Sequence, residues 1–87
     1  MSAKNTVTVK ICGLEYSVSS DESVEYIRRV TDIVDHSMTH LHKQDNRLST
    51  ALLAVLTAID CADKALKLSE ENKRLSSELE RLKTQRR

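Results

Sequence analysis

Three histidines and two cysteines are the side chains in this sequence whose types could do chemistry. His36 and His40 stand four residues apart, with Asp32 one turn before them and His42 close by. This spacing places two imidazoles on one face of a helix, which is a geometry that can bind zinc or another transition metal. No second segment supplies further ligands, and these side chains fall on the polar side of the predicted helix. We therefore interpret them as solvated histidines and predict no metal site and no cofactor.

The two cysteines give no stronger indication of catalysis. Cys12 and Cys61 belong to different predicted elements, and the chain contains no CxxC motif. Neither has a charged neighbourhood in the sequence that would activate its thiol as a nucleophile. The single glycine cannot build a phosphate-binding loop. The sequence therefore predicts free thiols in a reducing compartment, no catalytic residue and no enzyme activity.

The composition favours a small helical protein of the cytoplasm. The chain has 87 residues, no proline, a formal net charge of +1 and 2% aromatic residues. This composition lacks both the basic field and the stacking side chains of a nucleic-acid-binding surface. The longest apolar run, residues 51–59, is far shorter than the roughly 20 residues of a membrane span. The first residues also lack the layout of a signal peptide. We expect no membrane insertion and no nucleic-acid partner.

The segment TVTVKICGLEYSV, residues 6–18, alternates as a half-buried β-hairpin does. Its expected apolar face comprises Val7, Val9, Ile11, Tyr16 and Val18. Gly13 and Leu14 fit the central positions of a type II′ turn, because glycine supplies the positive φ angle that the first position requires. This turn would set Ile11 opposite Tyr16. A hairpin of this size needs a helix against its apolar face.

Two helices are predicted after the hairpin. Apolar residues recur at helical spacing over about residues 22–43, with Ser20 or Ser23 as the N-cap. A short polar turn, QDNRL, then leads to a long helix capped by Ser49 or Thr50. The predicted fold class is therefore α+β. A small ββα head at residues 1–48 is followed by a C-terminal helix at residues 49–87, whose first half packs on the head and whose second half forms an intermolecular coiled coil.

The long helix carries two apolar stripes. One repeats every 3.5 residues without a break, as the a and d positions of a coiled coil do. We name it the seam, and its members are Ala51, Ala54, Ala58, Cys61, Ala65, Leu68, Asn72, Leu75, Leu79 and Leu82. The other stripe, which we expect to pack on the head, comprises Leu52, Val55, Leu56, Ile59 and Leu66. Because one small head cannot cover both stripes, we predict that the seam binds a second copy of the chain, with Asn72 fixing the register.

Three segments in order, VTVKICGLEYSV, SVEYIRRV and RLSTALLAVLTAIDCADKALKL, resemble the ZapA family of bacterial cell-division proteins. The resemblance runs from about Asn5 into the coil. It implies a homodimer that can pair into a dimer of dimers, that is, a homotetramer. It also implies binding to filaments of FtsZ, the tubulin-like division protein, and crosslinking of these filaments in the Z-ring at midcell. The alternatives are an adaptor that binds another cytoplasmic protein through its coiled coil, and a nucleic-acid-binding dimer.

The resemblance also points to particular positions. Gly13 and Tyr16 match the hairpin of the family, and Arg47 matches the entry to its long helix. Charged residues near the hairpin turn and the interhelix turn are implied to bind the filament, and here these are Lys43, Asp45, Arg47, Glu15 and Lys10. The chain departs from the family at two positions, since Val24 stands where proline is frequent and Lys64 stands where an acidic residue is frequent.

Overall fold

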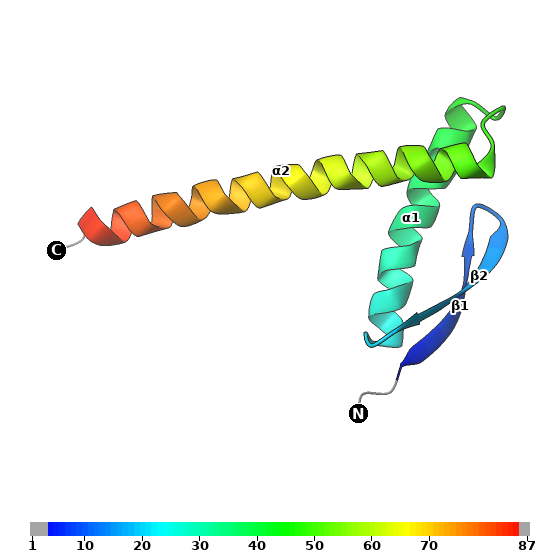
Figure 1. Cartoon of the computed structure of the whole chain (residues 1–87), viewed down its shortest axis with the longest axis horizontal. Helices are drawn as coiled ribbons and strands as arrows, with labels where there is room; N and C mark the ends of the chain where they lie inside the picture. Colours follow the sequence, from blue (N-terminus) through cyan, green and yellow to red (C-terminus); the bar gives the residue numbers. More distant parts are fainter. Residues whose placement is uncertain (1–3, 86–87) are drawn as a thin grey trace. The chain divides into compact units, whose positions relative to one another are not determined.

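The computed structural model describes residues 4–85 and consists of a hairpin followed by two helices (Figure 1). The elements in chain order are β1 (Asn5–Ile11), β2 (Leu14–Ser20), α1 (Val24–Gln44) and α2 (Thr50–Gln85). This confirms the predicted α+β architecture. The chain divides between Thr57 and Ala58 into two compact units, so that the first two turns of α2 belong with the hairpin and α1. Within the residues that the structure describes, no helix is long and apolar enough to cross a membrane.

The hairpin turn lies one residue earlier than the sequence predicts. Cys12 and Gly13 occupy its two central positions with φ angles of 52° and 83°, and Ile11 pairs with Leu14. Positive φ at both central positions identifies a type I′ turn, so the predicted type II′ turn was wrong. The change moves each cross-strand partner by two residues, and the apolar residues consequently stay on the predicted face.

A contact with α1 explains why Cys12 accepts this conformation. Left-handed backbone geometry destabilises a residue other than glycine by on the order of 1 kcal/mol. The backbone N–H of Cys12 donates a hydrogen bond of 2.7 Å to Oδ1 of Asp35. A hydrogen bond to a charged group contributes about 1.5–3 kcal/mol, which offsets the strain. We name this interaction the turn clasp. Its acceptor lies 23 residues further along the chain, where local turn patterns carry no information about it.

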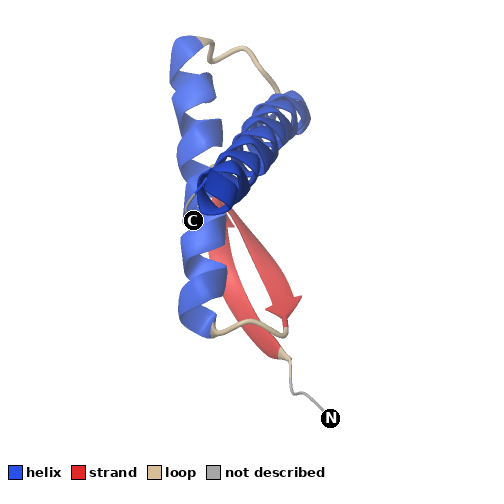
Figure 2. Cartoon of the chain, turned by 90° about the vertical axis from the view of Figure 1, so that its left-hand side faces the viewer, coloured by secondary structure: helices blue, strands red, loops and turns tan. Residues whose placement is uncertain are grey.

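The hairpin packs its apolar face against α1, as predicted (Figure 2). Val7 and Val9 of β1 and Ile27 of α1 are buried together, with Ile11 and Val18 packed at the edge of this cluster. The helix lies mainly over β1. Tyr16 of β2 consequently stays 43% exposed, although the sequence places it on the apolar face.

Both helices begin at serine caps. The side-chain oxygen of Ser23 accepts a hydrogen bond of 3.1 Å from the N–H of Tyr26, and that of Ser49 accepts one of 3.2 Å from Leu52. These two serines satisfy N–H groups that lack a partner in the first turn. Each is one of the two candidates that the sequence offered. The loop between the helices is therefore only five residues long, residues 45–49.

Replacing Cys12 with asparagine should stabilise the chain. Asparagine tolerates left-handed geometry and is favoured before glycine in type I′ turns. We expect a gain of about 0.5–1 kcal/mol in the free energy of unfolding, because part of the strain at this position is removed. A Cys12→Val variant, β-branched at a positive φ angle, should lose stability. Thermal unfolding followed by circular dichroism measures both changes, and an asparagine variant that melts below the valine variant would contradict the turn assignment.

Candidate functional site

Two segments far apart in the sequence line one hollow beside the C-terminal half of α1. One is the hairpin turn and the other is the loop that leads to α2 (Figure 1). An open hollow of about 350 Å³ lies between them, lined by Cys12, Gly13, Thr39, His42, Leu48, Thr50 and Leu53. The fold thus brings together the two turns that the sequence analysis singled out.

The five charged candidates lie on or next to these segments. Lys10 and Glu15 are cross-strand partners, one pair away from the residues that flank the turn. Lys43 lies in the last turn of α1, and Asp45 and Arg47 lie in the loop. All are exposed except the half-buried Asp45. We name the set the turn–loop charges: Lys10, Glu15, Lys43, Asp45 and Arg47.

Asp45 and Arg47 form an ordered ion pair inside the loop. The guanidinium donates to both carboxylate oxygens, from Nε to Oδ1 at 3.0 Å and from Nη2 to Oδ2 at 3.3 Å. The backbone N–H of Arg47 also donates to Oδ1, at 3.1 Å. These bonds, the side-chain bonds first, hold the pKa of Asp45 below its usual range. Because the Arg47 side chain is 87% exposed, its guanidinium is oriented by Asp45 and still accessible to a partner.

The second surface is the seam on α2. Every described residue from Ala58 onward is exposed, including the large side chains of Leu68, Leu75, Leu79 and Leu82. An isolated amphipathic helix is marginal in water, because most helical stability in proteins comes from packing of the apolar face. Nothing within residues 4–85 covers this face. The seam therefore has the character of an interface whose other half lies outside the chain.

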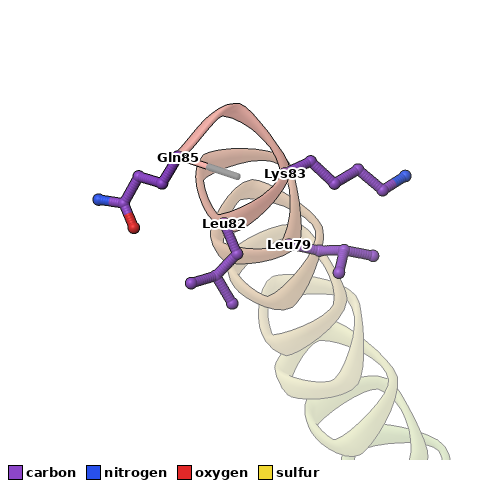
Figure 3. A pocket seen from close by; sticks show the side chains of 4 residues that line it. All are labelled: Leu79, Leu82, Lys83 and Gln85. Atoms are coloured by element: carbon purple, nitrogen blue, oxygen red, sulfur yellow. The ribbon is translucent and has the colours of Figure 1, made fainter. Parts of the chain in front are cut away.

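Leu79 and Leu82 are two of these uncovered seam residues, at the C-terminal end of α2 (Figure 3). Their side chains, with those of Lys83 and Gln85, border an open hollow on the flank of α2. A single helix cannot enclose a ligand, and binding sites for small molecules are normally concave and largely enclosed. We interpret this hollow as uncovered apolar surface that a second helix could fill.

The side of α2 that packs on the head differs from the prediction. Leu53 and Thr57 are 1% and 3% exposed, and Leu56 is half-buried. Leu52, Val55, Ile59 and Leu66, which were predicted to pack on the head, are all exposed. The buried position is Leu53 where the sequence predicts Leu52, a shift of one residue. Because adjacent helical residues point about 100° apart, this shift turns the predicted stripe away from the head. The rotation of α2 is set by its packing after the short loop, which periodicity alone does not specify.

The correction reveals a second uncovered stripe on α2. Its residues are spaced three and four apart in alternation, as in a coiled-coil interface. They are Leu52, Val55, Ile59, Ala62 and Leu66, and all of them are exposed. We name this set the second stripe. Helix α2 therefore carries two apolar faces at coiled-coil spacing, each shifted from the other by one residue.

Several charged side chains of α2 pair with one another. Lys64 contacts Asp60 at 3.0 Å and Lys67 contacts Asp63 at 3.1 Å, both one turn apart. The hydrogen bond and the charge of Asp60 raise the pKa of Lys64. Such exposed pairs add little to helix stability, because water screens the two charges. They do neutralise this flank, so the lysine that departs from the family pattern does not create a basic stripe there.

The histidines and cysteines do not form a chemical centre in the described structure. His36 and His40 are exposed, and within residues 4–85 no group of three or more metal-binding side chains comes together. Both cysteines are free, with Cys12 half-buried at the turn and Cys61 exposed on the seam. Asp35, which holds the turn, was not singled out by the sequence analysis, because its partner Cys12 lies 23 residues away in the sequence.

Comparison with known proteins gives a consistent result. The family model described as cell division protein ZapA matches residues 7–87. Proteins named cell division protein ZapA from Bacillus thuringiensis and Bacillus anthracis are 41% identical over 76 residues, covering 87% of this chain and 85% of theirs. The protein of that name from Oceanobacillus iheyensis is 37% identical over 68 residues, covering 78% of this chain and 79% of its own length.

A solved structure agrees with the fold. The ZapA mutant dimer from Geobacillus stearothermophilus superposes with a TM-score of 0.71 at 38% sequence identity, covering 90% of this chain and 91% of that one. The hairpin, α1 and the long α2 therefore match a structure at substantial sequence identity as well as a family model. With the turn–loop charges and the seam already in place, these matches show that the chain belongs to the ZapA family of cell division proteins.

Proposed function

We propose that this chain binds FtsZ filaments through its head and bundles them by holding several heads in one assembly. In this role it promotes assembly of the Z-ring at midcell and carries out no catalysis. The observation that carries the proposal is the uncovered seam, whose leucines are exposed along the whole second half of α2. An apolar face of this length would be covered by a second copy of the chain. The resulting assembly would then contain a second head.

Self-association through the seam supplies the first level of assembly. Small residues in its first half allow close approach of a partner helix, and leucines in its second half supply most of the apolar contact. Asn72 occupies an a position, where a buried polar residue specifies register at a cost in stability. The relative from Geobacillus stearothermophilus, described as a mutant dimer, supports a dimer here as well.

The second stripe supports a further level of assembly, a dimer of dimers. A helix with one heptad seam needs one neighbour, whereas a helix with two adjacent apolar faces can contact two neighbours, as in a four-helix arrangement. Leu52, Ile59 and Leu66 are 43%, 62% and 61% exposed in the chain. Burying them against a second pair of helices would cover apolar side chains that the seam leaves exposed.

The turn–loop charges are the proposed contact with the filament. They mix both signs, and all but Asp45 are exposed, as is typical of a polar interface that forms and separates readily. Each head would bind weakly on its own. Two or more heads on one assembly raise the effective local concentration for the next contact, so that bridging becomes strong without any new contact type.

Reversing the charge of Arg47 tests the proposed contact. An Arg47→Glu variant removes the exposed guanidinium and places two carboxylates side by side in the loop. We expect the amount of protein that pellets with polymerised FtsZ to fall several-fold, while the mass measured by light scattering stays that of the wild type. Arg81→Glu, which makes the same charge change on the exposed part of α2, is the matched control and should pellet normally. Unchanged pelleting of Arg47→Glu would remove this residue from the contact.

A further inference from the structure

We propose that Asp35 is a positioning residue for filament binding, because it holds the hairpin turn in place beside the α1–α2 loop. This inference rests on the function proposed above and names a residue outside the turn–loop charges. Asp35 contributes through Cys12 and does not itself contact the filament.

The geometry of the turn clasp carries the inference. Oδ1 of Asp35 accepts the N–H of Cys12 at 2.7 Å and also lies 3.5 Å from Oγ1 of Thr39, which donates to it. Thr39 stands one helical turn further on α1, and its hydroxyl is a second group within hydrogen-bond reach of this oxygen. Both interactions are partly buried, and partial burial shields them from competing water.

The clasp adds an attachment at the turn end of the hairpin, where only Ile11 packs at the edge of the core. The buried residues Val7 and Val9 anchor β1 along its middle, whereas Leu14, beside the turn, is 50% exposed. At the opposite end of the hairpin, Asn5 Nδ2 donates to the carbonyl oxygen of Glu22 at 2.7 Å. A two-stranded hairpin is marginally stable on its own, so the position of its turn depends on such attachments.

The position of the hairpin turn affects filament binding because the proposed contact surface combines residues of the hairpin with residues of the α1–α2 loop. Lys10 and Glu15 move with the hairpin, while Asp45 and Arg47 belong to the loop. The hollow between the two segments is lined by Cys12 on one side and by Leu48 on the other. Releasing the turn would change the spacing of the two charged groups without removing either of them. A partner that contacts both groups would then bind more weakly.

Three variants separate this role from a general loss of stability. Asp35→Ala removes the acceptor, whereas Asp35→Asn keeps an oxygen at the same position. Asp32→Ala makes the same charge change one turn earlier on α1, at an exposed residue. Melting temperature and light-scattering mass are measured for all three, and every comparison is made at a temperature at which the chains remain folded.

The first readout is hydrogen exchange of the Cys12 amide, which requires no filament. We expect exchange several-fold faster in Asp35→Ala than in the wild type, near-normal exchange in Asp35→Asn, and no change in Asp32→Ala. An unchanged exchange rate in Asp35→Ala would overturn the clasp itself.

The second readout is pelleting of the folded variants with polymerised FtsZ. We expect Asp35→Ala to lose most of its pelleting at unchanged assembly mass, while Asp35→Asn and Asp32→Ala retain it. Normal pelleting by Asp35→Ala despite fast amide exchange would overturn the positioning role. An equal loss in Asp32→Ala would overturn it too, because the effect would then be one of charge. If the wild type itself fails to pellet, the proposed function fails, and the exchange readout still decides the clasp.

Discussion

Replacing both Leu75 and Leu79 with glutamate should reduce the assembly to a smaller species and abolish filament bundling. The two leucines are 47% and 55% exposed in the chain and occupy consecutive core positions of the seam. Four carboxylates in the core of a two-stranded coil would repel one another and would lie unpaired in an apolar environment. We expect the mass measured by light scattering to fall and low-speed pelleting of FtsZ bundles to disappear.

A charge-matched control keeps this result interpretable. The pair Ser77→Glu and Lys73→Gln makes the same net charge change on the opposite face of the same turns of α2. This variant should keep the wild-type mass and bundle normally. If the leucine variant became monomeric and still bundled filaments, bridging by joined heads would be wrong, because one head would then suffice.

Truncating Leu53 should cause the largest loss of stability among single substitutions in the head. Its side chain is 1% exposed, the lowest value among the buried residues. Leucine-to-alanine changes at such positions cost about 2–5 kcal/mol, since apolar contact is lost and a cavity remains. We expect this loss at every protein concentration, because the contact lies within the chain. Chemical denaturation followed by circular dichroism measures it.

The neighbouring leucine provides the matched comparison. Leu52 has the same size but is 43% exposed, and Leu52→Ala should cost less than half as much. Whatever it costs should depend on protein concentration, because the second stripe would be buried only between copies. A larger and concentration-independent loss for Leu52→Ala would mean that the helix faces the head as the sequence analysis first predicted.

The elements themselves were predictable because their signals are local. Alternation over β1 and β2, apolar spacing over α1 and two serine caps lie within single segments of the sequence. The seam was equally readable, because a heptad pattern in one helix predicts an interface even when the partner is absent. These features account for the fold class and for the prediction that another copy covers α2.

The errors arose where contacts between segments decide the outcome. A lone glycine fits the first position of a type II′ turn and the second of a type I′ turn equally well. The bond from Cys12 to Asp35, 23 residues away, favours the latter. In the same way, α2 has apolar residues on several sides, so the sequence does not determine which side faces the head. In the structure, packing buries Leu53 in place of Leu52. Periodicity indicates that a face is apolar but does not say which partner covers it.

The turn–loop charges illustrate a different limit of prediction from sequence. Their types and positions could be read from the resemblance. That the hairpin turn and the α1–α2 loop line one hollow could not, since these two segments are distant in sequence. The structure adds the hollow between them and the ion pair that orients Arg47. The elements that carry these charges lie beside one hollow, and that the charges form a single contact surface stays a proposal.

Sedimentation of polymerised FtsZ with this protein at two speeds, paired with its light-scattering mass, tests the bridging mechanism most directly. High-speed pelleting reports binding to single filaments, whereas low-speed pelleting reports bundles. We predict that the wild type, with the mass of a dimer or a larger assembly, moves filaments into the low-speed pellet. Binding at high speed without any increase in the low-speed pellet, from a protein of multimeric mass, would contradict filament bridging.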